Sequence, residues 1–171
     1  MIILGLGSNL SSKYGDRFKN IELALSLLES NNIKIVKKSS FYESLSYPNK
    51  NNPKFINMVA LVQTHLKPLD LMTLILSIEK KLERLRKKRN DPRTCDIDII
   101  DYNSEIVEFT FRDTNFLSPH ISLSNRNFVL YPIKEILPTW KHPATNESID
   151  ILISKLPDED KKSILKIKNL L

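Results

Sequence analysis

The sequence predicts an α+β protein in which two helices cover one face of a sheet. Four short segments are either continuously apolar or alternate between apolar and polar residues, as strands do. Two segments between them repeat apolar residues every three or four positions, which is typical of amphipathic helices. The resulting order β-α-β-β-α-β is the ferredoxin-like arrangement, in which the second sheet face stays available. A C-terminal extension follows it.

The first half of this pattern begins with residues 2–6, an apolar run that ends at Gly7-Ser8-Asn9 and indicates a buried strand followed by a turn. Residues 17–29 show helical spacing, with Asp16 as a suitable N-cap. Residues 33–41 alternate as a half-exposed strand does. The polar stretch 44–54 is long for a connection between strands, which predicts a functional or a disordered loop.

The second half continues with a strand over residues 55–64 and a helix that starts at Pro68 and extends to about residue 85. Residues 95–102 form the fourth strand. In the extension we expect a short strand at 105–108 and helices at 128–136 and 149–155. The basic end after Pro157 is expected to fray.

The chain of 171 residues is 41% hydrophobic, which is enough for one core, so residues 1–171 are predicted to form a single domain. Cys95 is the only cysteine, which favours a reducing compartment. The apolar start lacks a basic leader and is too short to cross a bilayer. We therefore expect a soluble, cytoplasmic protein, and a monomer.

The strongest local signal is the pair Asp96 and Asp98, because residues two apart in a strand lie on one face, about 6.6 Å apart. The apolar residues of the same strand then face the helices. Two carboxylates at this spacing suit Mg²⁺ shared with substrate phosphates. A solvated strand face explains the pair equally well, so the aspartates alone do not decide.

Arginines just before the aspartates favour the magnesium interpretation. Six of the 26 basic residues lie between positions 84 and 93, and the arginines among them are Arg84, Arg86, Arg89 and Arg93. Arginine binds phosphate oxygens in a bidentate way, so the cluster predicts a local anion site. A basic helix end would explain Lys87 and Lys88, but it explains Arg93 poorly because that residue follows a proline.

Further candidates are an aromatic ring and a carboxamide on one strand face, Phe55 and Asn57, which could stack on and bond to a planar heterocycle. By themselves they are better explained as a core ring and a surface amide. His120, Arg126 and Phe128 add one more aromatic and two potential phosphate contacts. The glycines near the start lack the third glycine of a dinucleotide fingerprint, and there is no Walker A motif.

In their order along the chain, these motifs resemble the 6-hydroxymethyl-7,8-dihydropterin pyrophosphokinase family. The resemblance spans most of the chain, and each motif is weak while the ordered set is specific. Its segments are Gly7-Ser8-Asn9-Leu10, Phe55-Ile56-Asn57, residues 92–99 with the sequence Pro-Arg-Thr-Cys-Asp-Ile-Asp-Ile, Pro119-His120 through Arg126, Phe128-Val129-Leu130, and Pro132.

The resemblance implies transfer of pyrophosphate from ATP to the pterin hydroxymethyl oxygen, with release of AMP. It also implies the site residues, by role: Asp96 and Asp98 for two Mg²⁺; Arg84 and Arg93 for catalysis; Phe55, Asn57, Phe128 and the chain around Ser44, Leu45 and Tyr47 for the pterin; and Arg86, Ile99, His120 and Arg126 for ATP.

The chain departs from the family pattern at two places. Asn90-Asp91 stands where the family commonly has Trp-Gly, so the cover over the site lacks that ring. Ile121 replaces a tyrosine that contacts ATP in some members.

Two other functions stay open at this point. A ferredoxin-like RNA-binding module could stack bases on Phe55 and Phe128, although the aspartates would then repel the phosphate backbone. A nucleotide-binding domain without catalysis would use the same arginines and aspartates but would not turn over its nucleotide.

Overall fold

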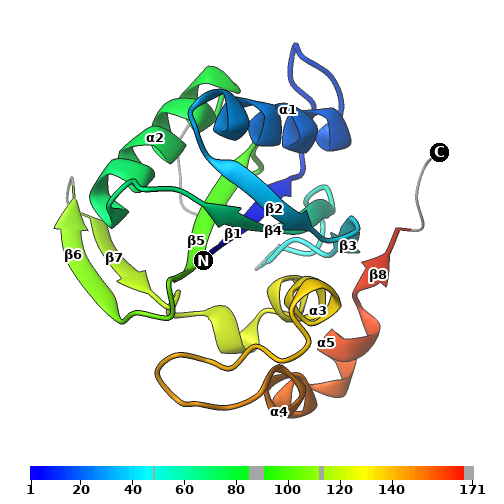
Figure 1. Ribbon diagram of the computed structural model, residues 1–171. Coiled ribbons are helices and arrows are strands. Elements are labelled where there is room, and N and C mark those ends of the chain that lie inside the picture. Colours follow the sequence, from blue (N-terminus) through cyan, green and yellow to red (C-terminus); the bar gives the residue numbers. More distant parts are fainter. Residues whose placement is uncertain (48, 85–90, 112–113, 168–171) are drawn as a thin grey trace.

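A computed structural model describes residues 1–47, 49–84, 91–111 and 114–167 (Figure 1). The elements in chain order are β1 (Ile2–Ser8), α1 (Arg17–Ser30), β2 (Lys34–Lys38), β3 (Tyr42–Ser44), β4 (Phe55–Gln63), α2 (Pro68–Lys81), β5 (Asp96–Tyr102), β6 (Val107–Phe111), β7 (Thr114–Ser118), the 3-10 helix η1 (Leu123–Asn125), α3 (Asn127–Ile136), α4 (Ile149–Lys155), α5 (Asp158–Lys162) and β8 (Leu165–Lys166).

The main sheet is antiparallel and follows the order β5-β1-β4-β3-β8, with β2 also paired to β4. β2 and β3 pair with different stretches of β4. β6 and β7 form a separate two-stranded hairpin. β1 therefore lies between β4 and β5, the two strands that carry Asn57, Asp96 and Asp98.

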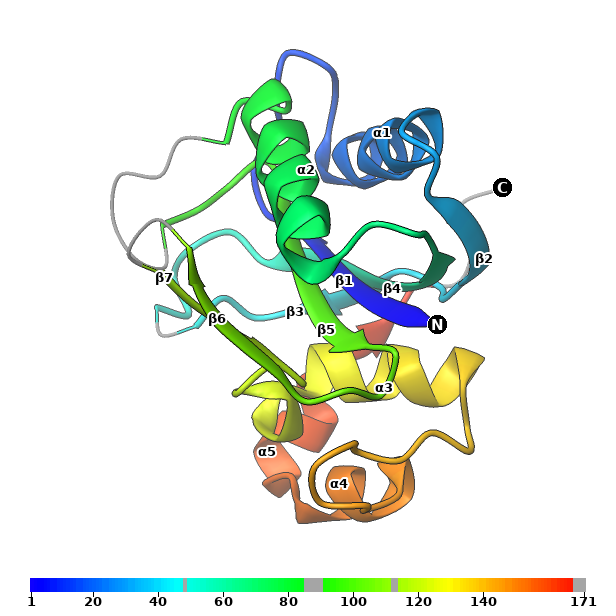
Figure 2. The same ribbon diagram turned by 60° about the vertical axis from the view of Figure 1, so that its left-hand side comes forward.

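One face of the sheet is covered by α1 and α2 (Figure 2). The alternation of the strands sends Leu4, Ile56 and Ile97 to this face, where all three are at most 5% exposed. Asp16 caps α1 by accepting a hydrogen bond from the Lys19 N–H at 2.9 Å. Both helices begin where the sequence predicts them.

The opposite face is not open over its whole extent, contrary to the expectation from sequence. α3 lies across it, with α4 packed on α3 (Figures 1 and 2). A second core joins the sheet residues Ile3, Val59 and Ile100 to Val129 and Leu130 of α3. The C-terminal extension thus buries part of this face, because α3 carries an apolar stripe that needs a partner.

Two of the predicted elements differ in length from those observed. The strand expected over 33–41 is divided into β2 and β3, and its pairing with β4 is irregular between Ile35 and Lys37. The helix expected to reach residue 85 ends at Lys81, and Glu83 has a positive φ of 65° that a helix cannot continue through. Residue 85 lies outside the described part of the chain.

The extension differs more. The strand expected at 105–108 is β6 at Val107–Phe111, and its partner β7 was not predicted. The end after Pro157 does not fray throughout: it forms α5 and then β8, which joins the main sheet. The helix at Ile149–Lys155 is as predicted. Within the described ranges, none of the helices has the length and apolar character that a membrane span requires.

Candidate functional site

The predicted site residues lie on the part of the second sheet face that α3 leaves uncovered. They form rows across the strands. Gly7 of β1 pairs with Asn57 on one side and with Asp96 on the other. Gly5 pairs with Asp98 in the next row. Cross-strand partners point to the same face. The register therefore brings the amide and the two carboxylates onto one surface, as the strand parity predicts.

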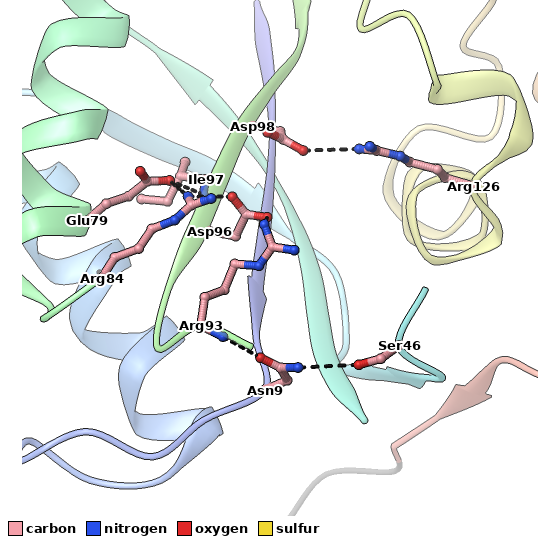
Figure 3. A network of polar contacts seen from close by, with 9 residues as sticks. All are labelled: Asn9, Ser46, Glu79, Arg84, Arg93, Asp96, Ile97, Asp98 and Arg126. Atoms are coloured by element: carbon pink, nitrogen blue, oxygen red, sulfur yellow. Dashed lines mark hydrogen bonds and ion pairs between the residues drawn. The ribbon is translucent and has the colours of Figure 1, made fainter. Parts of the chain in front are cut away.

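Asp96 is held by two arginines from the segment between α2 and β5 (Figure 3). Arg84 Nη1 bonds to Asp96 Oδ1, and Arg93 Nη1 lies 3.0 Å from Asp96 Oδ2. Burial lowers the pKa of Arg84, but the charges of Asp96 and Glu79 outweigh burial and raise it. The guanidinium therefore stays protonated, and the sequence-predicted catalytic arginines meet at one predicted metal ligand.

Glu79 of α2 is a further member of this network that the sequence did not suggest. Its carboxylate accepts hydrogen bonds from Arg84 Nη1 and, at 2.9 Å, from the Ile97 N–H. The side chains of Glu79 and Arg84 are only 2% and 8% exposed. Glu79 thus joins the end of α2 to β5 and fixes Arg84 beside Asp96 (Figure 3).

Asp98 pairs with an arginine from the other side of the site, since Arg126 Nη1 lies 3.1 Å from Asp98 Oδ2 (Figure 3). Removal from water and the neighbouring Asp96 charge raise the pKa of Asp98, although its side chain remains 37% exposed and water limits the shift. Burial lowers the pKa of His120, which favours the neutral imidazole. Its Nδ1 accepts a hydrogen bond from the Ser122 N–H at 3.1 Å.

Each predicted aromatic ring lies beside an arginine of the network. The Arg93 guanidinium carbon is 5.4 Å from the centre of the Phe55 ring, and that of Arg126 is 5.7 Å from the Phe128 ring. A side-chain carbon at Gly7 would lie 3.5 Å from the Phe55 ring. Gly7 therefore places no side chain against the Phe55 ring or the Asn57 amide.

Asn57 is oriented by β3. Its Nδ2 donates to Ser44 Oγ at 2.9 Å and to the Tyr42 carbonyl at 3.2 Å, so both amide hydrogens are bonded within the protein. Ser44 is buried, whereas the side chains of Leu45 and Tyr47 are exposed, that of Tyr47 by 82%. Of Ser44, Leu45 and Tyr47, only Ser44 has a side-chain hydrogen bond to a site residue within the described part of the chain.

Asn9 is a second residue that the sequence reasoning did not assign to the site. Its Oδ1 accepts from the Arg93 N–H at 2.6 Å, and its Nδ2 donates to the Pro53 carbonyl at 3.0 Å and to Ser46 Oγ at 3.3 Å (Figure 3). Asn9 is 2% exposed. It therefore ties the arginine segment to the loop between β3 and β4.

The donor set fits Mg²⁺ only in combination with substrate phosphates. Asp96 and Asp98 are hard oxygen ligands, and Mg²⁺ commonly binds proteins through one or two carboxylates. The described residues contain no group of three or more His, Cys, Asp and Glu side chains placed to hold a metal ion. Cys95 is fully buried, and burial raises the pKa of its thiol, so it is not a nucleophile.

Several predicted positions are not brought into this arrangement. Arg86, predicted for ATP, and Asn90, which replaces the family tryptophan, lie outside the described residues. The Ile99 side chain is 5% exposed and packs in the core beneath α1 and α2, which leaves only its main chain for a nucleotide contact. Ile121 is 80% exposed.

The RNA-binding alternative requires an open sheet face with stacking aromatics. α3 covers part of that face, and the uncovered part carries Asp96 and Asp98 beside the arginines. Carboxylates there oppose a phosphate backbone. The geometry is therefore less suited to a nucleic-acid backbone than to a small ligand held by the arginines.

Comparison with known proteins agrees with this geometry. The model of a family described as 7,8-dihydro-6-hydroxymethylpterin-pyrophosphokinase (HPPK) matches residues 3–138. The 2-amino-4-hydroxy-6-hydroxymethyldihydropteridine pyrophosphokinase of Aquifex aeolicus is 37% identical over 83% of this chain and 83% of its own length. The folic acid synthesis protein fol1 of Pneumocystis carinii is 35% identical over 96% of this chain and 21% of its own length.

The chain spans about a fifth of the length of the fol1 proteins that it matches. Among solved structures, Plasmodium falciparum HPPK-DHPS wild type with pteroate has the same fold, with a TM-score of 0.74 and 16% identity. That match covers 99% of this chain and 46% of the Plasmodium chain.

Proposed function

Since the chain belongs to the 7,8-dihydro-6-hydroxymethylpterin-pyrophosphokinase family, we propose that it transfers the pyrophosphoryl group of ATP to 6-hydroxymethyl-7,8-dihydropterin. The products are AMP and the pterin diphosphate, an intermediate of folate biosynthesis. The observation that carries this proposal is the pair Asp96 and Asp98 on one strand face, each paired with arginine beside an aromatic ring.

The nucleotide side of the proposed site consists of Asp96, Asp98 and the arginines around them. The two carboxylates would hold Mg²⁺, with two ions per ATP as the family resemblance implies, and bound Mg²⁺ would neutralise phosphate charge. Arg84 and Arg93 would contact the transferred phosphates. Arg93 Nε is buried without a hydrogen-bond partner among the described residues, so it has a donor to offer.

Further ATP contacts are proposed for Arg86, His120, Arg126 and the Ile99 main chain. Arg126 already lies 3.1 Å from Asp98, so a phosphate at the carboxylates is within its reach. The neutral His120 donates from Nε2, since its Nδ1 is the acceptor for Ser122 N–H. A neutral donor binds a phosphate oxygen without adding another positive charge.

The pterin side of the proposed site consists of Gly7, Phe55, Phe128 and Asn57. A pterin ring would stack between the two aromatics. Because both Asn57 amide hydrogens are bonded to the protein, its Oδ1 is the atom that accepts from the pterin edge. Backbone groups near Ser44, Leu45 and Tyr47 would complete the edge contacts.

In the transfer step the pterin hydroxymethyl oxygen attacks the β-phosphorus of ATP, the bond from that phosphorus to the α-phosphate bridging oxygen breaks, and AMP leaves. The hydroxyl proton passes to solvent. No covalent enzyme intermediate is needed, which agrees with the buried Cys95 thiol. Positioning of the two substrates and stabilisation of charge by the arginines supply most of the rate enhancement.

We also propose that residues 1–171 act as one ferredoxin-like domain with a C-terminal extension, and as a monomer. The strand order β5-β1-β4-β2, with α1 and α2 on one face, supports the ferredoxin-like assignment.

The experiment that tests the proposed function separates the nucleotide products of a reaction with ATP, Mg²⁺ and the reduced pterin. We expect AMP to form in amounts equal to the pterin consumed, and no AMP without Mg²⁺ or without pterin. ADP as the product would exclude pyrophosphoryl transfer. Binding of ATP with no turnover in the complete mixture would favour a non-catalytic nucleotide-binding domain.

A further inference from the structure

Residues 158–167, which we call the C-terminal strap, comprise α5, β8 and the link between them. They lie beyond residues 3–138, the part that the family model matches. In Figure 1 the strap extends from below α3 to the outer side of β3. These are the two elements that carry Phe128 and Ser44 of the proposed pterin site.

The first contact of the strap is with the start of α3. Asn127 Nδ2 donates to the Asp160 carbonyl at 2.6 Å and to Ser163 Oγ at 3.0 Å. Asn127 is 7% exposed. It stands between Arg126, which pairs with Asp98, and Phe128. The strap therefore bonds to the one residue that separates two proposed ligand contacts.

The second contact extends the sheet. β8 pairs antiparallel with β3, Tyr42 opposite Lys166 and Glu43 opposite Leu165. The Ile167 N–H donates to the Phe41 carbonyl at 2.8 Å. Without β8, this side of β3 would be a free edge of only three residues. The added strand restrains β3, whose last residue, Ser44, orients Asn57.

The third contact closes the connection between strap, β3 and α3. Glu135 of α3 accepts from Tyr42 Oη at 2.8 Å and from Ser40 Oγ at 2.8 Å, and its carboxylate lies 3.1 Å from Lys166 Nζ. One carboxylate thus joins all three segments. An additional ion pair from Lys50 to Glu159 is solvent-exposed and adds little.

From these contacts we propose that the C-terminal strap is a positioning element for the pterin substrate, which holds α3 and β3 at the separation that stacking and edge bonding require. The proposal rests on the proposed function, because it assigns the pterin to the space between these elements. Asn127 and Ile167 are its positioning residues. Among the described residues, the Asn127 side chain and the Ile167 N–H form hydrogen bonds to the strap and to Phe41, and not to the aspartates or arginines of the nucleotide side.

Two variants of the full chain test the proposal. Asn127→Ala removes both hydrogen bonds to the strap. Ile167→Pro removes the N–H that pairs with Phe41, whereas the matched Ile167→Ala keeps it. Lys162→Ala, at an exposed position on α5, is the second control. Steady-state kinetics with each substrate varied in turn, and thermal unfolding of each variant, are the measurements.

We expect the KM for the pterin to rise about three- to tenfold in Asn127→Ala and Ile167→Pro, as the loss of one or two net hydrogen bonds implies. The KM for ATP and kcat should stay within twofold, and both controls should match the wild type. A strap that only stabilises the fold would lower the melting temperature without changing the pterin KM, and this result would overturn the proposal.

If Asn127→Ala does not fold, Ser163→Ala removes one acceptor only, and a pterin KM equal to that of the wild type would count against the strap. The wild-type reaction separates the two proposals. A wild type that forms no AMP refutes the proposed function and the premise of the strap with it. If the wild type is active and the folded variants keep its pterin KM, the positioning role of the strap is refuted and the proposed function is not.

Discussion

Replacing Glu79 by glutamine keeps the shape of a buried side chain but removes its negative charge. The Glu79 and Arg84 side chains are 2% and 8% exposed, so the pair is shielded from water. Removing one partner of a buried ion pair costs about 3–5 kcal/mol of unfolding free energy. Arg84 keeps its bond to Asp96, and glutamine keeps an acceptor for the Ile97 N–H, so we expect a loss of about 2 kcal/mol for Glu79→Gln.

The catalytic consequence follows from the position of Arg84. Without the Glu79 charge the guanidinium is held by Asp96 alone, and a displacement of about 1 Å can cost about 10²-fold in rate. We therefore expect kcat of Glu79→Gln to fall by about that factor, with the KM for the pterin unchanged. Urea unfolding and steady-state kinetics provide both values. Glu29→Gln, at an exposed position of α1, is the matched control.

Unchanged stability together with unchanged kcat in Glu79→Gln would refute the assigned network. A loss of stability with normal kcat would show that Glu79 supports the fold and leaves Arg84 correctly placed. Only the combined loss agrees with the proposed role of the residue in orienting Arg84.

Three further predictions concern other parts of the site. Asp98→Asn should abolish AMP formation while pterin binding, followed by fluorescence titration, stays within threefold; normal turnover would remove the metal assignment. Gly7→Ala places a methyl group 3.5 Å from the Phe55 ring and 3.4 Å from Asn57 Oδ1, so the pterin KM should rise while the melting temperature stays within a few degrees. An unchanged pterin KM would show that the pterin does not bind beside Gly7. Burial raises the pKa of Glu135, but the hydrogen bonds that its carboxylate accepts outweigh burial and lower it. Glu135 therefore stabilises the fold above pH 4.5 and loses this effect as the pH falls, so Glu135→Gln should lose less unfolding free energy on acidification than the wild type. Equal acid sensitivity would contradict this.

Strand parity predicts the centre of the site from sequence. Asp96 and Asp98 alternate with Ile97 and Ile99, and the structure places the isoleucines in the core and the aspartates on the other face. This works because a strand has a period of two and one face is buried. This alternation of apolar and acidic residues lies within one short segment, so it can be recognised without knowledge of any distant contact.

Residues that act through distant contacts are not predictable in this way. Glu79 lies one turn after Ile75 on the buried stripe of α2, and a charged residue at such a position indicates a buried partner of opposite charge without identifying it. Asn9 meets Arg93 and Pro53 only because three loops converge. β8 has two residues, too few to show any periodicity, so the C-terminal strap cannot be predicted from the sequence pattern.

The proposed function requires that a pyrophosphoryl group moves in one step from ATP to the pterin. Mass spectrometry of the pterin after a single turnover with ATP labelled with ¹⁸O in its γ-phosphate tests this transfer. We expect a pterin that carries two phosphoryl groups, with the label on the outer one, and one AMP per product. A pterin with a single labelled phosphoryl group, accompanied by ADP, would contradict one-step pyrophosphoryl transfer.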